Sequence, residues 1–208
     1  MPLAIDDTTM KTIRFVLTIA LLAGPALAQD ATQVRKLFEA GQYQAVIDMN
    51  ASPETSPEVA YMAAQSEQKV GNKGAAVAMY GRLAGLPEGN PWRLIGLSGH
   101  HLLANDNDQA REFAQQAVTA APDLPEAHYQ LGLVLARVLD WGGAAVAFDR
   151  AAELNPGMAY AHYYGGLAHY RASRPDRMAI HFEQFLRLAP DAPERPEVTQ
   201  IMRTVRGR

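Results

Sequence analysis

The chain repeats short residue patterns at a constant interval of 34 positions. Three separate series keep this step: one of prolines, one of alanines and one in which every member is small. They are Pro122, Pro156 and Pro190; Ala76, Ala110 and Ala144; and Ala64, Ser98, Gly132 and Gly166. Self-similarity with this period predicts a helix–turn–helix unit that stacks on copies of itself as a solenoid. A solenoid presents an extended surface to another polypeptide, so we expect a binding protein and not an enzyme.

Composition narrows the class of protein further. A length of 208 residues suits one ordinary domain. The composition, with 48% hydrophobic and 20% charged residues, is normal for a globular protein. The formal net charge of -3 and the pI near 6.1 argue against nucleic acid as a partner. The lack of cysteine excludes disulfides, thiolate nucleophiles and cysteine-bound metals, and it suits an oxidising compartment.

Residues 1–28 have the composition of a secretory signal peptide. Lys11 and Arg14 form a basic region, residues 15–23 are an apolar run, and Ala28 ends a small-x-small site. The run is shorter than the roughly 20 residues that a comfortable membrane span needs. We therefore expect cleavage after Ala28, no integral membrane span in the mature chain, and a periplasmic location.

Two alternatives stay open at this end of the chain. The predicted mature chain begins at Gln29, but the apolar segment can instead be retained as an uncleaved anchor. Met10 can also be the true start in place of Met1, because Asp6 and Asp7 are unusual ahead of a signal sequence.

Beyond that segment the apolar spacing is helical almost throughout. The expected division is a degenerate helical pair over 29–56, four repeats over 57–90, 91–124, 125–158 and 159–190, and a cap helix with a tail over 191–208. The last segment places four apolar side chains on one helical face, namely Val198, Ile201, Met202 and Val205. Because the last unit of a solenoid exposes an apolar face, we expect this helix to cover it.

Polar residues mark where several helices begin. Ser56 and Asn90 each precede a proline, which predicts an N-cap followed by proline in the first turn. Asp123 with Glu126 three residues later has the spacing of a capping box.

The series made only of small residues indicates where the two helices of each unit cross, because small side chains let the backbones approach closely. The alanine series lies on the second helix of each unit and is expected to face these small residues. Three aromatic residues at matching places are expected to fill the gaps, namely Tyr80, Phe148 and Phe182. The prolines end each second helix, since proline cannot continue the helical hydrogen bonds.

One unit carries enough of a known pattern to indicate a family. Its first helix reads Ala127-His128-Tyr129-Gln130-Leu131-Gly132, and Ala144, Phe148, Ala151 and Pro156 follow. This segment resembles a tetratricopeptide repeat, and the resemblance covers about residues 31–190. It implies an all-α, right-handed α-solenoid of about four and a half repeats with a C-terminal capping helix. His128 and His162 stand where the family often has tryptophan, and Gly165 replaces the leucine before Gly166.

The resemblance also implies a binding groove, because such solenoids bind peptides on the inner face of their first helices. The residues expected there are Tyr61, Gln65, Gln68, Lys69, Trp92, Ile95, Leu102, Tyr129, Leu133, Arg137, Tyr160, Tyr163, Tyr170 and Arg171. We expect Tyr129 and Tyr163 to be exposed in this groove, although rings at these places can instead pack between repeats. Chaperone-type members of the family clamp a terminal carboxylate with paired lysine and asparagine. The expected groove lacks the asparagine set, so that ligand is not expected.

Histidine is the one candidate for metal or acid–base chemistry. His162 and His169 lie two turns apart on one predicted helix, about 10 Å along its axis, which is too far for both to bind one ion. His128 and His162 share one place in the repeat, which favours a packing role. No phosphate-binding loop, zinc-protease motif or nucleophile elbow is present. We therefore expect no catalytic residue, cofactor or metal.

Three functions remain open. The first is a non-catalytic scaffold that holds a segment of a partner protein in the bacterial cell envelope. The second is an accessory subunit of a periplasmic maturation machine, for example one that presents apocytochromes to a haem-attachment complex. The third is an enzyme or a small-molecule binder with a histidine site. In the first two the partner is another protein or peptide, and a second copy of the chain can also be a partner.

Overall fold

The computed structural model describes residues 31–50 and 55–206, and every regular element in these ranges is a helix. The predicted signal peptide and both candidate start residues lie outside the described residues. A helical segment over 31–39 comes first. The later helices are α2 (Tyr43–Met49), α3 (Pro57–Lys69), α4 (Lys73–Ala84), α5 (Pro91–Leu103), α6 (Asn107–Ala120), α7 (Pro125–Arg137), α8 (Trp141–Leu154), α9 (Ala159–Arg171), α10 (Pro175–Leu188) and α11 (Arg195–Arg206).

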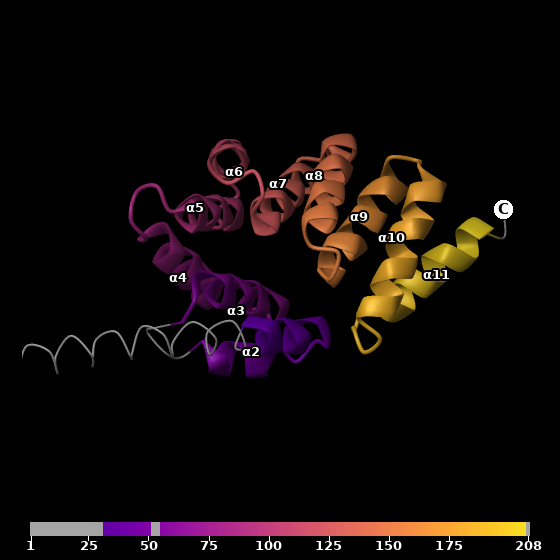
Figure 1. The fold of residues 1–208 in the computed structure, drawn as a ribbon, viewed down its shortest axis with the longest axis horizontal. Helices are drawn as coiled ribbons and strands as arrows, with labels where there is room; N and C mark the ends of the chain where they lie inside the picture. Colours follow the sequence, from indigo (N-terminus) through magenta and orange to yellow (C-terminus); the bar gives the residue numbers. More distant parts are fainter. Residues whose placement is uncertain (1–30, 51–54, 207–208) are drawn as a thin grey trace, which may run out of the picture.

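Each helix packs mainly on its neighbours in the chain, so the molecule follows an arc from α2 to α11 (Figure 1). The helices form antiparallel pairs: α3 with α4, α5 with α6, α7 with α8, and α9 with α10. The first helices of successive pairs also contact one another, from α3 to α5, α7 and α9, and form the inner layer. This arrangement confirms the predicted all-α solenoid.

The small residues lie where helices cross, as their period predicted. A Cβ atom added to Gly132 would lie 2.6 Å from the Phe148 ring, and one added to Gly166 would lie 2.4 Å from the Phe182 ring. Ser98 is fully buried, and its Oγ donates to the carbonyl of Ala110 at 2.9 Å. Both phenylalanine rings are fully buried. Because glycine has no side chain, each ring can pack directly on the backbone of the opposite helix in its pair.

The turn inside each pair also repeats with the period. Gly71, Asn105, Leu139 and Ser173 are 34 positions apart, and their φ angles are 87°, 62°, 64° and 58°. A residue with positive φ ends many helices, because this conformation satisfies the last backbone carbonyls. Glycine adopts it freely, whereas a leucine is strained there. A positive φ angle at this turn therefore occurs in every pair, even where the residue is one that disfavours it.

Two of the three predicted helix starts are confirmed. Ser56 accepts a hydrogen bond from Val59 N–H, and Asn90 accepts one from Trp92 N–H. The predicted Asp123–Glu126 capping box is wrong, because α7 has Leu124 at its N-cap and no side-chain cap.

The C-terminal helix α11 covers the end of the solenoid, as its apolar face predicted. It contacts α10, and Val198 and Met202 are buried. Ile201 and Val205, one turn away on the same face, are half-buried.

Candidate protein-binding groove

The inner layer of α3, α5, α7 and α9 forms a concave face, as the resemblance implied. This face has two parts. Its centre is filled by the chain's own residues, and a cleft beside that centre stays open.

The N-terminal hairpin, which is residues 31–39 together with α2, lies against the centre of the concave face. Arg35 from this hairpin binds Glu58 of α3 and Glu126 of α7, with its Nη2 2.9 Å from Glu126 Oε1. Burial raises the pKa of Glu126, and the attraction of Arg35 offsets that rise only in part. Glu126 therefore serves as the partner of a distant arginine rather than as a local helix cap.

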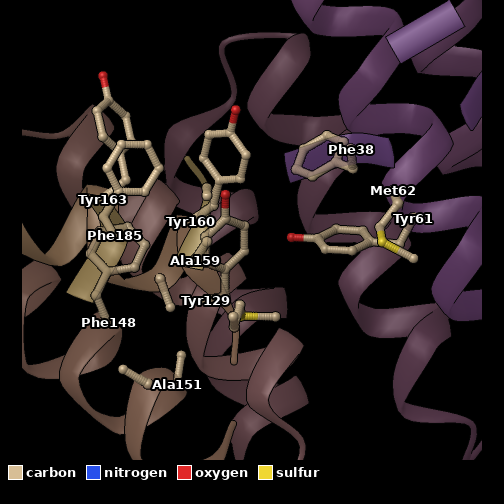
Figure 2. Packing of buried hydrophobic residues seen from close by; sticks show 14 of the residues in the cluster. Phe38, Tyr61, Met62, Tyr129, Phe148, Ala151, Ala159, Tyr160, Tyr163 and Phe185 are labelled. Carbon is tan, nitrogen blue, oxygen red and sulfur yellow. The ribbon is translucent and has the colours of Figure 1, made fainter. Parts of the chain in front are cut away.

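Aromatic contacts join this hairpin to the last repeat. The ring centroids of Phe38 and Tyr160 are 5.0 Å apart with the ring planes tilted by 57°, and Figure 2 shows the two rings side by side. The hydroxyls of Tyr43 and Tyr160 are 3.0 Å apart. Glu39 accepts a hydrogen bond from Ala159 N–H, at the first turn of α9. The cavity left at this centre measures about 20 Å³, room for about one water molecule.

The C-terminal segment holds the same ring cluster from the other side. Glu194 accepts hydrogen bonds from Lys69 Nζ at 2.6 Å and from the Tyr160 hydroxyl at 2.8 Å. Glu197 accepts one from the Tyr163 hydroxyl at 3.0 Å. Lys69 Nζ also lies 5.0 Å from the centroid of the Tyr160 ring. The N-terminal hairpin and the C-terminal segment therefore both cover the inner face of α9.

The expected exposure of Tyr129 and Tyr163 is wrong. Their exposed fractions are 3% and 6%. Tyr129 packs on the rings of Phe148 and Tyr164, in its own and the next repeat. Tyr163 packs on Phe185 and donates to Glu197 of α11. Tyr61, Ile95 and Tyr160 are buried in the same cluster, so the apolar surface predicted for a partner is used for folding.

Three further predicted residues lie outside this buried centre. The Arg171 guanidinium lies 5.6 Å from the centroid of the Trp141 ring, which belongs to α8 in the outer layer. Tyr170 is exposed. Trp92 is half-buried and packs on Tyr61, with ring centroids 5.9 Å apart.

The open cleft has a volume of about 530 Å³, within the range of pockets that hold ligands. Its lining residues are Phe38, Gln65, Gln68, Lys69, Lys73, Leu102, Leu103, Asn105, Tyr129, Leu133, Ala136, Arg137 and Tyr164. The floor is apolar and the charged members are cations, while none of the described lining residues is acidic. The cleft therefore favours an apolar segment with negative charge.

Sequence reasoning found part of this lining and missed part. Gln65, Gln68, Lys69, Leu102, Tyr129, Leu133 and Arg137 had been placed on the inner face. Asn105 was not among the predicted groove residues, yet it lines the cleft, and its Oδ1 accepts a hydrogen bond from Arg137 Nη2 at 2.6 Å. Lys73 opens α4 and was not considered, although its place directly after the α3–α4 turn was a usable signal.

No protein-family model matches the chain. Among solved structures, it is similar to TTC0263, a thermophilic TPR (tetratricopeptide repeat) protein of Thermus thermophilus, with TM-score 0.60 and 17% identity over 86% of this chain and 97% of that one. The chain has the tetratricopeptide repeat fold. It is also similar to the first TPR of Spaghetti (RPAP3), which was solved bound to the HSP90 peptide SRMEEVD. That likeness covers 59% of this chain and 97% of that one, with TM-score 0.52 and 17% identity.

Two histidines have a structural role in this TPR fold. His128 Nε2 lies 2.8 Å from the carbonyl oxygen of Pro122, and His162 Nε2 lies 3.3 Å from that of Pro156. The two contacts are equivalent in successive repeats, which confirms the expected packing role. Burial lowers the pKa of His162, which favours the neutral form of this ring.

Within the described residues, no helix of the TPR fold is both long and apolar enough to cross a bilayer.

Proposed function

We propose that this chain is a non-catalytic adaptor that holds an acidic, partly apolar segment of a partner protein in the open cleft. The observation that carries the proposal is the cleft lining, which combines an apolar floor with lysine and arginine and contains no acidic side chain among the described residues.

The floor supplies the affinity. Leu102, Leu103, Leu133 and Ala136 are all half-buried, so each keeps apolar surface for a partner. Covering such surface contributes about 25 cal/mol per Å².

The cations supply the preference for charge. Lys73 on α4 and Arg137 on α7 are both exposed, and both line the cleft. A carboxylate between them gains attraction to both, whereas a cationic segment is repelled. RPAP3 offers a parallel in the same fold, since the peptide bound to it contains two glutamates and an aspartate.

Binding can be tested with labelled peptides of one length and one leucine pattern that carry either aspartate and glutamate or lysine. Fluorescence anisotropy is expected to show binding of the acidic peptide only. Free and amidated carboxyl ends separate recognition of side chains from recognition of a terminus.

Two substitutions locate the binding surface. Arg137→Glu reverses a charge in the cleft and is expected to weaken acidic peptide binding by at least about 10-fold. Arg150→Glu makes the same change on α8, where the arginine faces Asp123 and Glu153, and is expected to leave binding unchanged. Equal effects of the two variants, or equal binding of the basic peptide, would contradict the proposal.

We also propose that the adaptor works in the bacterial periplasm. This rests on the basic, apolar and small-x-small order of residues 1–28. Mass spectrometry of the chain recovered from the periplasm should give an amino terminus at Gln29. An intact Met1 or Met10 terminus would contradict cleavage.

A further inference from the structure

Outside the groove, three side chains that can bind a metal meet from three helices. Asp149 lies on α8, His169 on α9 and His181 on α10. His169 Nε2 is 2.9 Å from Asp149 Oδ1, and His181 Nε2 is 2.8 Å from the same oxygen. The three ligand atoms lie within 4.8 Å of one another. No residue of this cluster lines the open cleft.

The neighbouring repeat provides an internal reference. One period earlier, the places of Gly165, His169 and His181 hold apolar side chains, namely Leu131, Leu135 and Ala147. The last repeat therefore replaces an apolar set with two histidines. Gly165 belongs to the same change, because a Cβ atom there would lie 2.8 Å from His181 Nδ1. The departure of Gly165 from the family pattern makes room for the His181 ring.

Plain packing does not account for this replacement. Both histidines are more than nine-tenths buried, and leucine or alanine at these places would bury no polar nitrogen. Among the described residues, neither Nδ1 atom has a hydrogen-bond partner. The cluster therefore keeps two buried nitrogen atoms unsatisfied while aiming both Nε2 atoms at one carboxylate oxygen.

We propose that Asp149, His169 and His181 bind one divalent transition-metal ion, with zinc as the best fit. Two imidazole nitrogens and one carboxylate oxygen are a usual zinc ligand set, and a fourth position is left for water. The ion takes the place of the two hydrogen bonds between Nε2 and Asp149 Oδ1, and each ring binds it through Nε2 with a proton on Nδ1. Asp149 is partly exposed, at 28% of its side chain, and gives the ion a path from solvent.

The expected metal affinity depends on the hydrogen-bond partners of the ligand side chains. Metal-bound histidines usually donate their other N–H, and loss of such a partner weakens binding about 10–100-fold. Because both Nδ1 atoms lack partners among the described residues, we expect micromolar rather than nanomolar dissociation constants. Zinc would tie α8, α9 and α10 together and so stabilise the C-terminal end of the solenoid.

Calorimetry with zinc chloride on the untagged full chain tests the site. The wild-type chain is expected to bind one ion in this cluster. At about 100-fold excess over the dissociation constant, its Tm should rise by roughly 5–10 °C. The double variant His169→Leu, His181→Ala restores the residues of the preceding repeat, so it is expected to fold and to lose this ion and the Tm shift.

Two further variants sharpen the result. Asp149→Asn keeps the size of the side chain but loses its charge, and is expected to weaken zinc binding by at least about 10-fold. His100→Ala, His101→Ala removes two neighbouring histidines outside this cluster, whose ring centroids are 5.8 Å apart, and is expected to keep the ion.

A measurement on the wild-type chain alone guards against a folding defect in the variants. Nitrogen-15 NMR of the imidazoles should show zinc shifting the Nε2 signals of His169 and His181 and placing the proton on Nδ1. The proposal is overturned if the wild-type chain takes up no zinc. It is equally overturned if these two rings do not respond, or if binding survives in the apolar double variant.

Discussion

Arg35 and Glu126 form an ion pair across 91 positions of the chain, with 2.9 Å between Arg35 Nη2 and Glu126 Oε1. The arginine belongs to the N-terminal hairpin and the glutamate to the first turn of α7. The pair crosses the hollow of the solenoid instead of following its repeat. It therefore holds the hairpin in the space where tetratricopeptide solenoids are expected to bind peptides.

Arg35→Ala should lower the free energy of unfolding by about 2 kcal/mol, because it leaves a buried carboxylate without its cation. The Glu126 side chain is only 6% exposed. Arg111→Ala is the matched control, since it breaks a pair in which the Asp108 side chain is 94% exposed, and should change stability very little. Urea denaturation measures both variants, and equal losses would show that the Arg35 pair does not hold the hairpin.

Glu39→Gln should stabilise the chain at neutral pH. Burial raises the pKa of Glu39 by more than the hydrogen bond from Ala159 N–H and the attraction of Arg35 lower it. The folded-state pKa thus lies above the unfolded value, so the charged form costs stability at high pH. That cost disappears as pH falls through the folded pKa toward the unfolded one. Denaturation of both proteins from about pH 8 to about pH 4 should show the advantage of glutamine shrinking with acidity. An advantage that grows on acidification would contradict the sign.

Leu139→Gly should raise the free energy of unfolding by about 1 kcal/mol, because it removes the strain of a positive φ. Leu139 has φ 64° and its side chain is exposed, so little packing is lost. Leu139→Ala keeps the strain and serves as the control. Thermal unfolding should rank glycine above alanine, and the reverse order would indicate that the turn is not strained.

Gly132→Ala should destabilise the fold by about 1–3 kcal/mol, because the new methyl group overlaps the buried Phe148 ring. The same change at Gly142 is a close comparison, since the nearest atom to an added Cβ there is Asp140 Oδ1 at 3.8 Å. Gly142→Ala should be neutral or slightly stabilising, because alanine favours helix over glycine. Denaturant midpoints should therefore fall for Gly132→Ala and hold or rise for Gly142→Ala, and an equal fall in both would contradict the close crossing at Gly132.

Contacts within and between adjacent repeats were predictable, because they recur with the period. Gly132 and Gly166 lie against phenylalanine rings, and Ser56 and Asn90 cap their helices, as local spacing indicated. The predicted capping box at Glu126 did not form, because α7 has Leu124 and not Asp123 at its N-cap. The Glu126 carboxylate instead pairs with Arg35, a contact that local spacing does not indicate.

The exposure of the residues on the inner face could not be predicted in the same way. The pattern correctly placed Tyr129 and Tyr163 on first helices, but whether a ring on the inner face meets solvent depends on what else enters the hollow. The N-terminal hairpin and the C-terminal segment both do so, through Phe38 and Glu194. The metal-ligand cluster was missed too, because Asp149, His169 and His181 form no motif and meet only through the packing of three helices.

Repetition in the amino acids therefore established the helices, their pairing and the curved solenoid, since every unit meets its neighbours through the same short-range contacts. The tertiary structure alone decided which part of the concave face is filled and which part stays open. Curvature accumulates over several units and brings residues 31–39 against α9, and no spacing within a single unit encodes that distance.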